Sequence, residues 1–169
     1  MTSSRNLIIT ALAFLLLACS CQSKKDPIAQ LQEQLTKDGI ALQKLQDDYQ
    51  DRLMEDFQWC DSMLQYVPKD KVEEYFDVLN LAQAYLHQFD ALLPVMQHDL
   101  TYINQQLVNL QSDLDSHYIN DSLGMVYLHD ETLSADTLHH RVLYFKDRLS
   151  SQDEALQSLK KSIRKDVSK

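Results

Sequence analysis

The scarcity of glycine is the feature of this sequence that most limits the folds open to it. The 169 residues include only two glycines, where average usage predicts about a dozen. All-β folds use glycine in their frequent turns, and parallel α/β folds use it in phosphate-binding loops and strand–helix connections. The glycine motifs of nucleotide-binding sites and of hydrolase nucleophiles are excluded for the same reason. The sequence therefore predicts helices with few turns.

Composition and charge narrow the class of protein further. Hydrophobic residues make up 44% of the chain, so we expect a folded protein rather than a disordered one. The length favours a single domain. The formal net charge is -9, and this disfavours nucleic acid as a partner, because binding to a phosphate backbone needs a basic face.

The first 21 residues have the pattern of a secretory leader. Arg5 supplies one positive charge, and an apolar run follows from Leu7 to Leu17. Such a run is too short to span a bilayer comfortably and is typical of the hydrophobic part of a signal peptide. We therefore exclude residues 1–18 from the folded domain.

The leader ends in Leu16-Leu17-Ala18-Cys19, and this segment resembles the lipobox of bacterial lipoproteins. The resemblance implies cleavage before Cys19 and acylation of its thiol with chains such as palmitate, which would hold the protein on a membrane. Cys21 is the alternative lipidation site. In the family's sorting rule an Asp after the cysteine retains the protein at the inner membrane, so Ser20 implies the outer membrane, with the domain facing the periplasm or the cell surface.

The rest of the chain divides into a short polar tether, residues 19–27, and a helical domain, residues 28–169. Three stretches of this domain carry apolar residues at steps of three and four, which is the spacing of one helix face. They run from Ile28 to about Tyr66, from Asp70 to about residue 117, and from Ser134 through Ile163. The pattern predicts an all-α fold, an elongated antiparallel three-helix coiled-coil bundle.

Three points in this pattern need an interpretation. Gly39 keeps the apolar positions in phase on both sides, which favours a continuous helix. Pro94 lies between apolar flanks without turn residues, so we expect a kink; the alternative is four helices with a true turn at Pro94. Beyond Tyr49 the steps lengthen to repeated fours, which locally unwind a supercoil.

Residues 118–133 read as a long irregular loop, because Gly124 and the preceding Asn-Asp-Ser group are typical of a break. Ser134 is then the expected N-cap of the last helix. Histidines and carboxylates gather over residues 117–140, and His117, His129 and His139 are weak candidates for metal ligands. Their spacing matches no known metal motif, so we expect neither a metal nor another cofactor.

Other candidate residues point to contacts with partners. Trp59 and Tyr66 lie in an aromatic-rich segment around the first turn, and Tyr127 lies in the expected loop; aromatic residues of this kind dominate binding hot spots. Cys60 falls on the apolar face and is interpreted as a buried, inert thiol. The C-terminus adds a group of four basic residues, Lys160, Lys161, Arg164 and Lys165.

These features together favour an interaction protein over an enzyme. We expect an outer-membrane lipoprotein whose bundle is a structural or accessory protein-interaction module of the cell envelope, with another envelope protein as partner and homo-oligomers possible. One alternative is a ligand- or metal-binding lipoprotein that uses residues 117–140. Another is a cell-wall tether that acts through the basic C-terminus.

Overall fold

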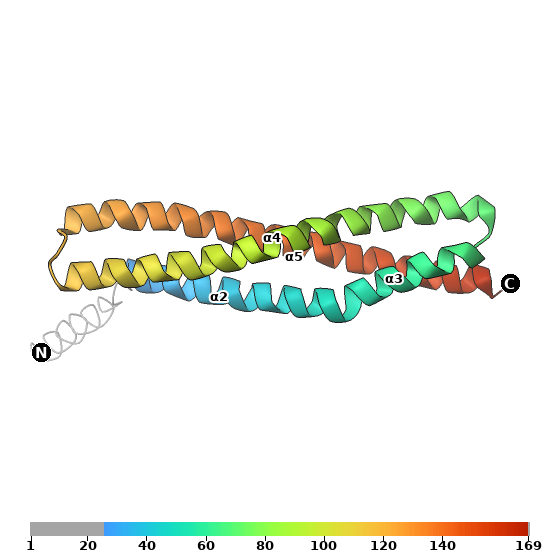
Figure 1. The fold of residues 1–169 in the computed structure, drawn as a ribbon, viewed down its shortest axis with the longest axis horizontal. Helices are drawn as coiled ribbons and strands as arrows, with labels where there is room; N and C mark the ends of the chain where they lie inside the picture. The colour runs from blue at the N-terminus through green and yellow to red at the C-terminus, as the bar shows by residue number, and fades with distance from the viewer. Residues whose placement is uncertain (1–25, 169) are drawn as a thin grey trace, which may run out of the picture.

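The described part of the chain, residues 26–168 of a computed structural model, forms a three-helix bundle (Figure 1). Its first long segment consists of α2 (Pro27–Asp48), the π-helical turn η1 (Tyr49–Leu53), α3 (Met54–Met63) and the 3-10 turn η2 (Leu64–Tyr66). The chain then returns through α4 (Lys69–Asp115) and runs back through α5 (Asp121–Val167). Residues 26–168 contain no strand, so the predicted all-α fold is confirmed.

The core runs the length of the bundle as a single column of apolar side chains. At mid-length one aromatic ring comes from each long segment: Tyr49, Phe89 and Phe145. The ring centroids of Tyr49 and Phe89 lie 5.4 Å apart, and those of Phe89 and Phe145 lie 5.3 Å apart. Such tilted and edge-on contacts add to the stabilisation that burial already gives.

The helices continue through both expected weak points. Gly39 lies inside α2, and Pro94 lies inside the 47-residue α4. The interpretation of three long helices is therefore confirmed, and the alternative with a true turn at Pro94 is wrong. The lengthened apolar steps beyond Tyr49 coincide with η1, where the π-helical hydrogen bonding adds a residue to one turn.

The predicted loop at residues 118–133 is wrong, because α5 already begins at Asp121. The Asn120 side chain caps this helix by accepting a hydrogen bond from the Leu123 backbone nitrogen at 2.9 Å. Ser134 lies in mid-helix, where its hydroxyl bonds the Asp130 carbonyl. Gly124 makes a close contact within α5 and does not mark a turn, since a Cβ atom there would lie 2.6 Å from Leu114 Cδ2.

The two connections define the two ends of the rod. We call the end at which α2 begins the near end. There the chain enters α2 after Asp26, and residues 116–120 join α4 to α5. At the far end η2 leads into α4, and α5 terminates (Figure 1). The tip of the α4–α5 hairpin extends beyond the start of α2, so among residues 26–168 only α4 and α5 form the last turns at the near end (Figure 1).

Candidate functional site

Trp59 lies at the far end, in contact with two cationic side chains of α5. Lys160 Nζ is 5.4 Å and the Arg164 guanidinium carbon is 5.2 Å from the centroid of the indole ring. Both distances are in the range of attractive cation–π contacts. Trp59 is half-buried and packs against the core. The structure thus brings together three of the residues that the sequence suggested for partner contacts.

Asp56 explains why Lys160 lies against this ring. Its buried carboxylate accepts hydrogen bonds from Lys160 Nζ and from the Gln157 side-chain amide. A buried carboxylate needs such partners, because burial of an unpaired charge is costly. Lys160 is therefore part of the fold as well as of the basic group.

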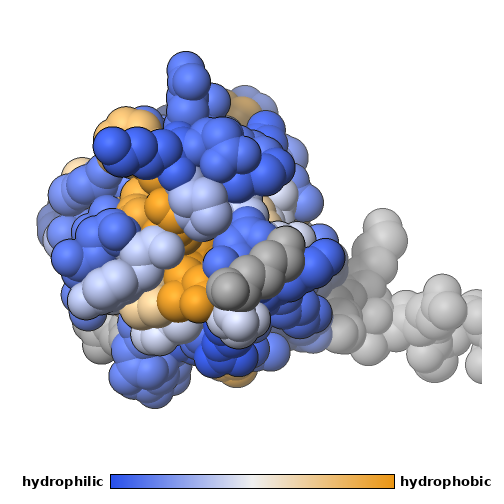
Figure 2. Space-filling model, turned by 90° about the vertical axis from the view of Figure 1, so that its right-hand side faces the viewer, coloured by the Kyte–Doolittle hydropathy of each residue, from blue (hydrophilic) through white to orange (hydrophobic). Residues whose placement is uncertain are grey.

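The remaining basic residues and Tyr66 are open to solvent. Lys161, Arg164 and Lys165 are exposed on α5, and Tyr66 in η2 is 61% exposed. Figure 2 looks onto this end of the rod and shows apolar surface at its centre, ringed by hydrophilic residues. We call the set of Trp59, Tyr66 and the four basic residues the basic end.

Tyr127, the remaining partner candidate, lies at the opposite end of the molecule. It belongs to a group of exposed apolar and aromatic side chains on the α4–α5 connection and the first turns of α5, which we call the apolar tip. The tip comprises Tyr118, Leu123, Met125, Val126 and Tyr127, and Tyr118 is 80% exposed. The structure therefore separates the candidates into two surfaces about one rod length apart.

The three histidines that the sequence suggested as metal ligands lie in different surroundings from one another. His139 Nδ1 lies 2.7 Å from the buried Asp38 carboxylate on α2. His117 shapes the α4–α5 connection with a positive φ of 58°, and its Nδ1 lies 3.1 Å from the Asp115 carbonyl oxygen. His129 is exposed on α5. Within residues 26–168 no three His, Cys, Asp or Glu side chains are grouped closely enough to hold a metal ion.

Cys60 is fully buried on α3, as its position on the apolar face predicts. Burial, with a further contribution from the Asp56 carboxylate, raises the pKa of this thiol from 9.0 to about 11. The thiolate is the reactive form of cysteine. The raised pKa keeps Cys60 in its protonated form at neutral pH, which agrees with a buried thiol of low reactivity.

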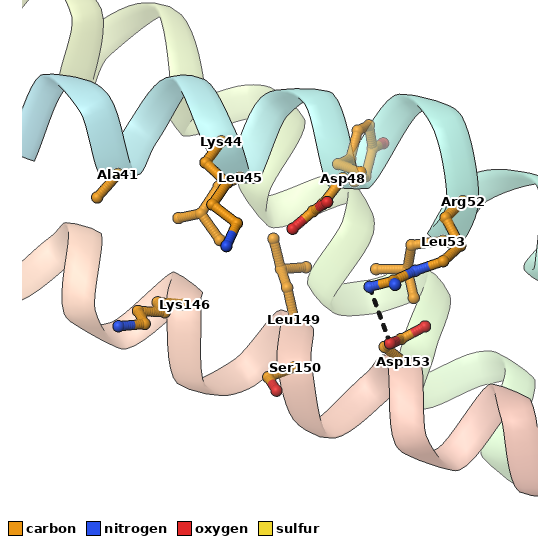
Figure 3. A pocket seen from close by; sticks show the side chains of 11 residues that line it. Ala41, Lys44, Leu45, Asp48, Arg52, Leu53, Lys146, Leu149, Ser150 and Asp153 are labelled. Carbon is orange, nitrogen blue, oxygen red and sulfur yellow. Dashed lines mark ion pairs between the residues drawn. The ribbon is translucent and has the colours of Figure 1, made fainter.

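A pocket at mid-length was missed from the sequence. It opens between α2–η1 and α5, and Lys44, Leu45, Lys146 and Leu149 are among the residues that line it (Figure 3). No motif connects these positions, which lie a hundred residues apart. The only sequence signal near them is the run of four-residue apolar steps beyond Tyr49, and it indicated an irregular helix without indicating a cavity.

No protein-family profile, curated protein or solved structure matches this chain. Among the helices of residues 26–168, none combines the length and the apolar character that crossing a membrane requires. The proposed lipidation sites Cys19 and Cys21 lie outside the described residues.

Proposed function

We propose that this protein is an outer-membrane-anchored lipoprotein whose helical bundle is a non-enzymatic structural or accessory module that binds another protein of the cell envelope. The lipobox-like leader supports the anchor. One structural observation supports the interaction with a partner away from the anchor. The chain enters the bundle at the near end, whereas the basic end lies at the opposite end of the rod (Figure 1).

This arrangement orients the molecule on a membrane. Residues 19–27, fully extended, span at most roughly 30 Å, so lipid on Cys19 keeps the near end close to the bilayer. The exposed tyrosines of the apolar tip suit this position, because such rings favour the membrane–water interface. α5 has 47 residues, and at 1.5 Å per residue it carries the basic end about 70 Å outward.

The basic end has the composition of a protein-binding surface. Trp59 and Arg164 are residue types that dominate hot spots, and here the cation–π contact holds their side chains together. Preorganised side chains lose less conformational entropy on binding. A partner with an acidic, partly apolar surface fits this end.

Crosslinking in cells tests the interaction. A photoreactive residue at Tyr66 should give a discrete adduct with a partner, whereas the same residue at Ile40, exposed on the side of the rod, should not. An adduct of twice the chain's mass would identify a second copy as the partner. Recovery of monomer alone from Trp59, Tyr66 and Tyr127 positions would contradict the proposal.

Metabolic labelling with radioactive palmitate tests the anchor separately. The unmodified protein and Cys21→Ala should incorporate label, and Cys19→Ala should lose it. Label that persists in Cys19→Ala and disappears in Cys21→Ala would identify Cys21 as the lipidated residue. Absence of label from the unmodified protein would exclude lipidation.

The exposure of Lys161 and Lys165 favours a second candidate, a tether between the membrane and anionic cell-wall polymer. Both side chains are free to contact an external anion, whereas Lys160 is bound to Asp56. Full-length protein should then co-sediment with purified peptidoglycan, and Lys161→Glu with Lys165→Glu should abolish this. Protein that stays in the supernatant would reject the tether and leave the protein-binding proposal intact.

A further inference from the structure

The mid-length pocket between α2–η1 and α5 has the features of a ligand site. Its volume is about 290 Å³, close to the lower limit of small-molecule sites in proteins. All the residues that line the pocket belong to α2, η1 or α5, so its wall consists of helices (Figure 3). It lies away from both the basic end and the apolar tip.

The π-helical turn accounts for the presence of a cavity here. Tyr49–Leu53 forms one wide turn with an additional residue, which changes the direction in which the following side chains point. Ala41 lies about two turns earlier on the same wall and has too small a side chain to fill the space. π-helical turns inside α-helices are often found at functional sites.

The inner wall of the pocket is apolar. Leu45 and Leu53 come from the first long segment, and Leu149 faces them from α5 (Figure 3). Leu53 and Leu149 are buried in the core. A ligand body that contacts these three side chains is removed from water, so it should be hydrocarbon.

The rim of the pocket is charged, with an excess of cations. Lys44, Arg52 and Lys146 oppose Asp48 and Asp153, a local charge of +1 on a chain whose net charge is -9. Arg52 is paired with Asp153 at 3.0 Å. Asp48 is four residues from both Lys44 and Arg52, so these neighbours on the same helix face offset its charge. Lys44 and Lys146 are the rim cations without an ion pair among the described residues, so both are left to attract an anion.

Asp153 has a further property that points to a ligand. Its Oδ1 atom is buried and has no hydrogen-bond partner among the described residues, although Oδ2 is bound to Arg52. A buried acceptor without a partner is unfavourable. A hydroxyl or amide of a bound molecule would satisfy this oxygen.

We propose that this pocket binds a small amphiphilic anion, a carboxylate with a compact hydrocarbon body that bears a hydroxyl group. The hydrocarbon lies against Leu45, Leu53 and Leu149, the carboxylate reaches Lys44 and Lys146 at the rim, and the hydroxyl donates a hydrogen bond to Asp153 Oδ1. The site is independent of the lipid anchor and of the basic end, so its failure would not affect the proposed function.

Photolabelling of the full chain in neutral detergent tests the site. The probe is a hydroxydecanoic acid that carries a diazirine group, and adducts are mapped by mass spectrometry of peptides. We expect adducts within residues 41–53 and 146–153, and their loss on competition with unlabelled decanoate. Decyltrimethylammonium, which has the same chain and the opposite charge, should not compete. Adducts confined to residues 1–25, or equal competition by both compounds, would overturn the proposal.

Two variants with matched controls locate the binding chemistry. Lys44→Glu with Lys146→Glu should lower pocket labelling by about tenfold or more, since an attraction to a charged group is replaced by repulsion. Lys69→Glu, at an exposed lysine of the far end, should leave pocket labelling unchanged.

A second variant tests the cavity itself. Ala41→Trp should fill the cavity and block labelling, whereas Ala84→Trp, at an exposed position on α4, should not. Labelling that persists in the folded double lysine variant, checked by circular dichroism, would reject the site.

Discussion

At the scale of single residues, two buried carboxylates connect the first long segment to α5. Asp38 contacts His139, 101 residues later, and Asp56 contacts Gln157 and Lys160, 101 and 104 residues later. α2 and α3 run parallel to α5, so these nearly equal separations correspond to one register. Apolar contacts tolerate sliding better than paired polar groups do, and the two carboxylates therefore favour this alignment over neighbouring ones.

Removal of His139 should show the contribution of the Asp38 pair. His139→Ala leaves a buried carboxylate without its partner, and we expect the free energy of unfolding to fall by about 2 kcal/mol, less than for a fully enclosed pair because His139 is partly exposed. Urea unfolding followed by circular dichroism measures this. The exposed neighbour is the control, and His140→Ala should change stability by less than about 0.5 kcal/mol. Equal effects of the two variants would argue against the role of the pair.

Cys60 gives a pH-dependent prediction. Its pKa is raised from 9.0 to about 11 in the folded protein, so between these values the unfolded chain releases a proton that the folded chain keeps. Stability should therefore decrease as the pH rises from 9 to 11. The decrease should be steeper for the unmodified protein than for Cys60→Ala, in which the other titrating groups remain. Parallel pH profiles of the two proteins would contradict the raised pKa.

At the scale of helices, Pro94 should lower the stability of α4, because it lies inside a continuous helix. Proline removes one backbone hydrogen bond and strains the preceding turn. Pro94 is exposed, so Pro94→Ala should restore that bond without disturbing the core and should raise the free energy of unfolding by about 1–3 kcal/mol. Thermal unfolding measures the change. A loss of stability would mean that the proline side chain itself is required for packing.

The two glycines should respond in opposite directions to substitution by alanine. A Cβ on Gly39 would lie 3.0 Å from the flexible end of Leu100, so Gly39→Ala should stabilise α2 by about 0.5 kcal/mol through helix propensity. A Cβ on Gly124 would lie 2.6 Å from Leu114 Cδ2, and Gly124→Ala should destabilise the protein by about 1 kcal/mol. Truncation in Leu114→Ala should remove this difference between glycine and alanine.

The same glycines show what the sequence could and could not predict. The phase of the apolar positions carried the helix correctly through Gly39 and Pro94, because that signal extends over several turns. At Gly124 the interpretation failed, since a glycine selected for close contact with Leu114 looks the same in sequence as one selected for a turn. The Trp59–Arg164 contact and the mid-length pocket depend on residues about a hundred positions apart, and no local pattern encodes their proximity.

At the scale of the whole molecule, the structure predicts a gradient of local stability. The turns of α4 and α5 next to their connection at residues 116–120 extend past the start of α2 (Figure 1), so no third helix of the described residues covers them and they bury less apolar surface. Backbone amides there should exchange hydrogen faster than those of residues 138–149, where all three segments meet. Hydrogen exchange with mass spectrometry measures this. Uniform protection along α5 would show that another part of the chain or a partner covers the tip.

The position of the two chain ends also determines how the rod carries load. Residue 26 lies at one end and residue 168 at the other, with α2–α3 and α5 parallel between them (Figure 1). A pull between the start of α2 and the end of α5, as the proposed anchor and partner would exert, acts along the interface between these helices, in shear. Contacts arranged in shear share the force and rupture together, whereas contacts that are peeled open fail one at a time. The bundle is therefore built to transmit tension along its axis.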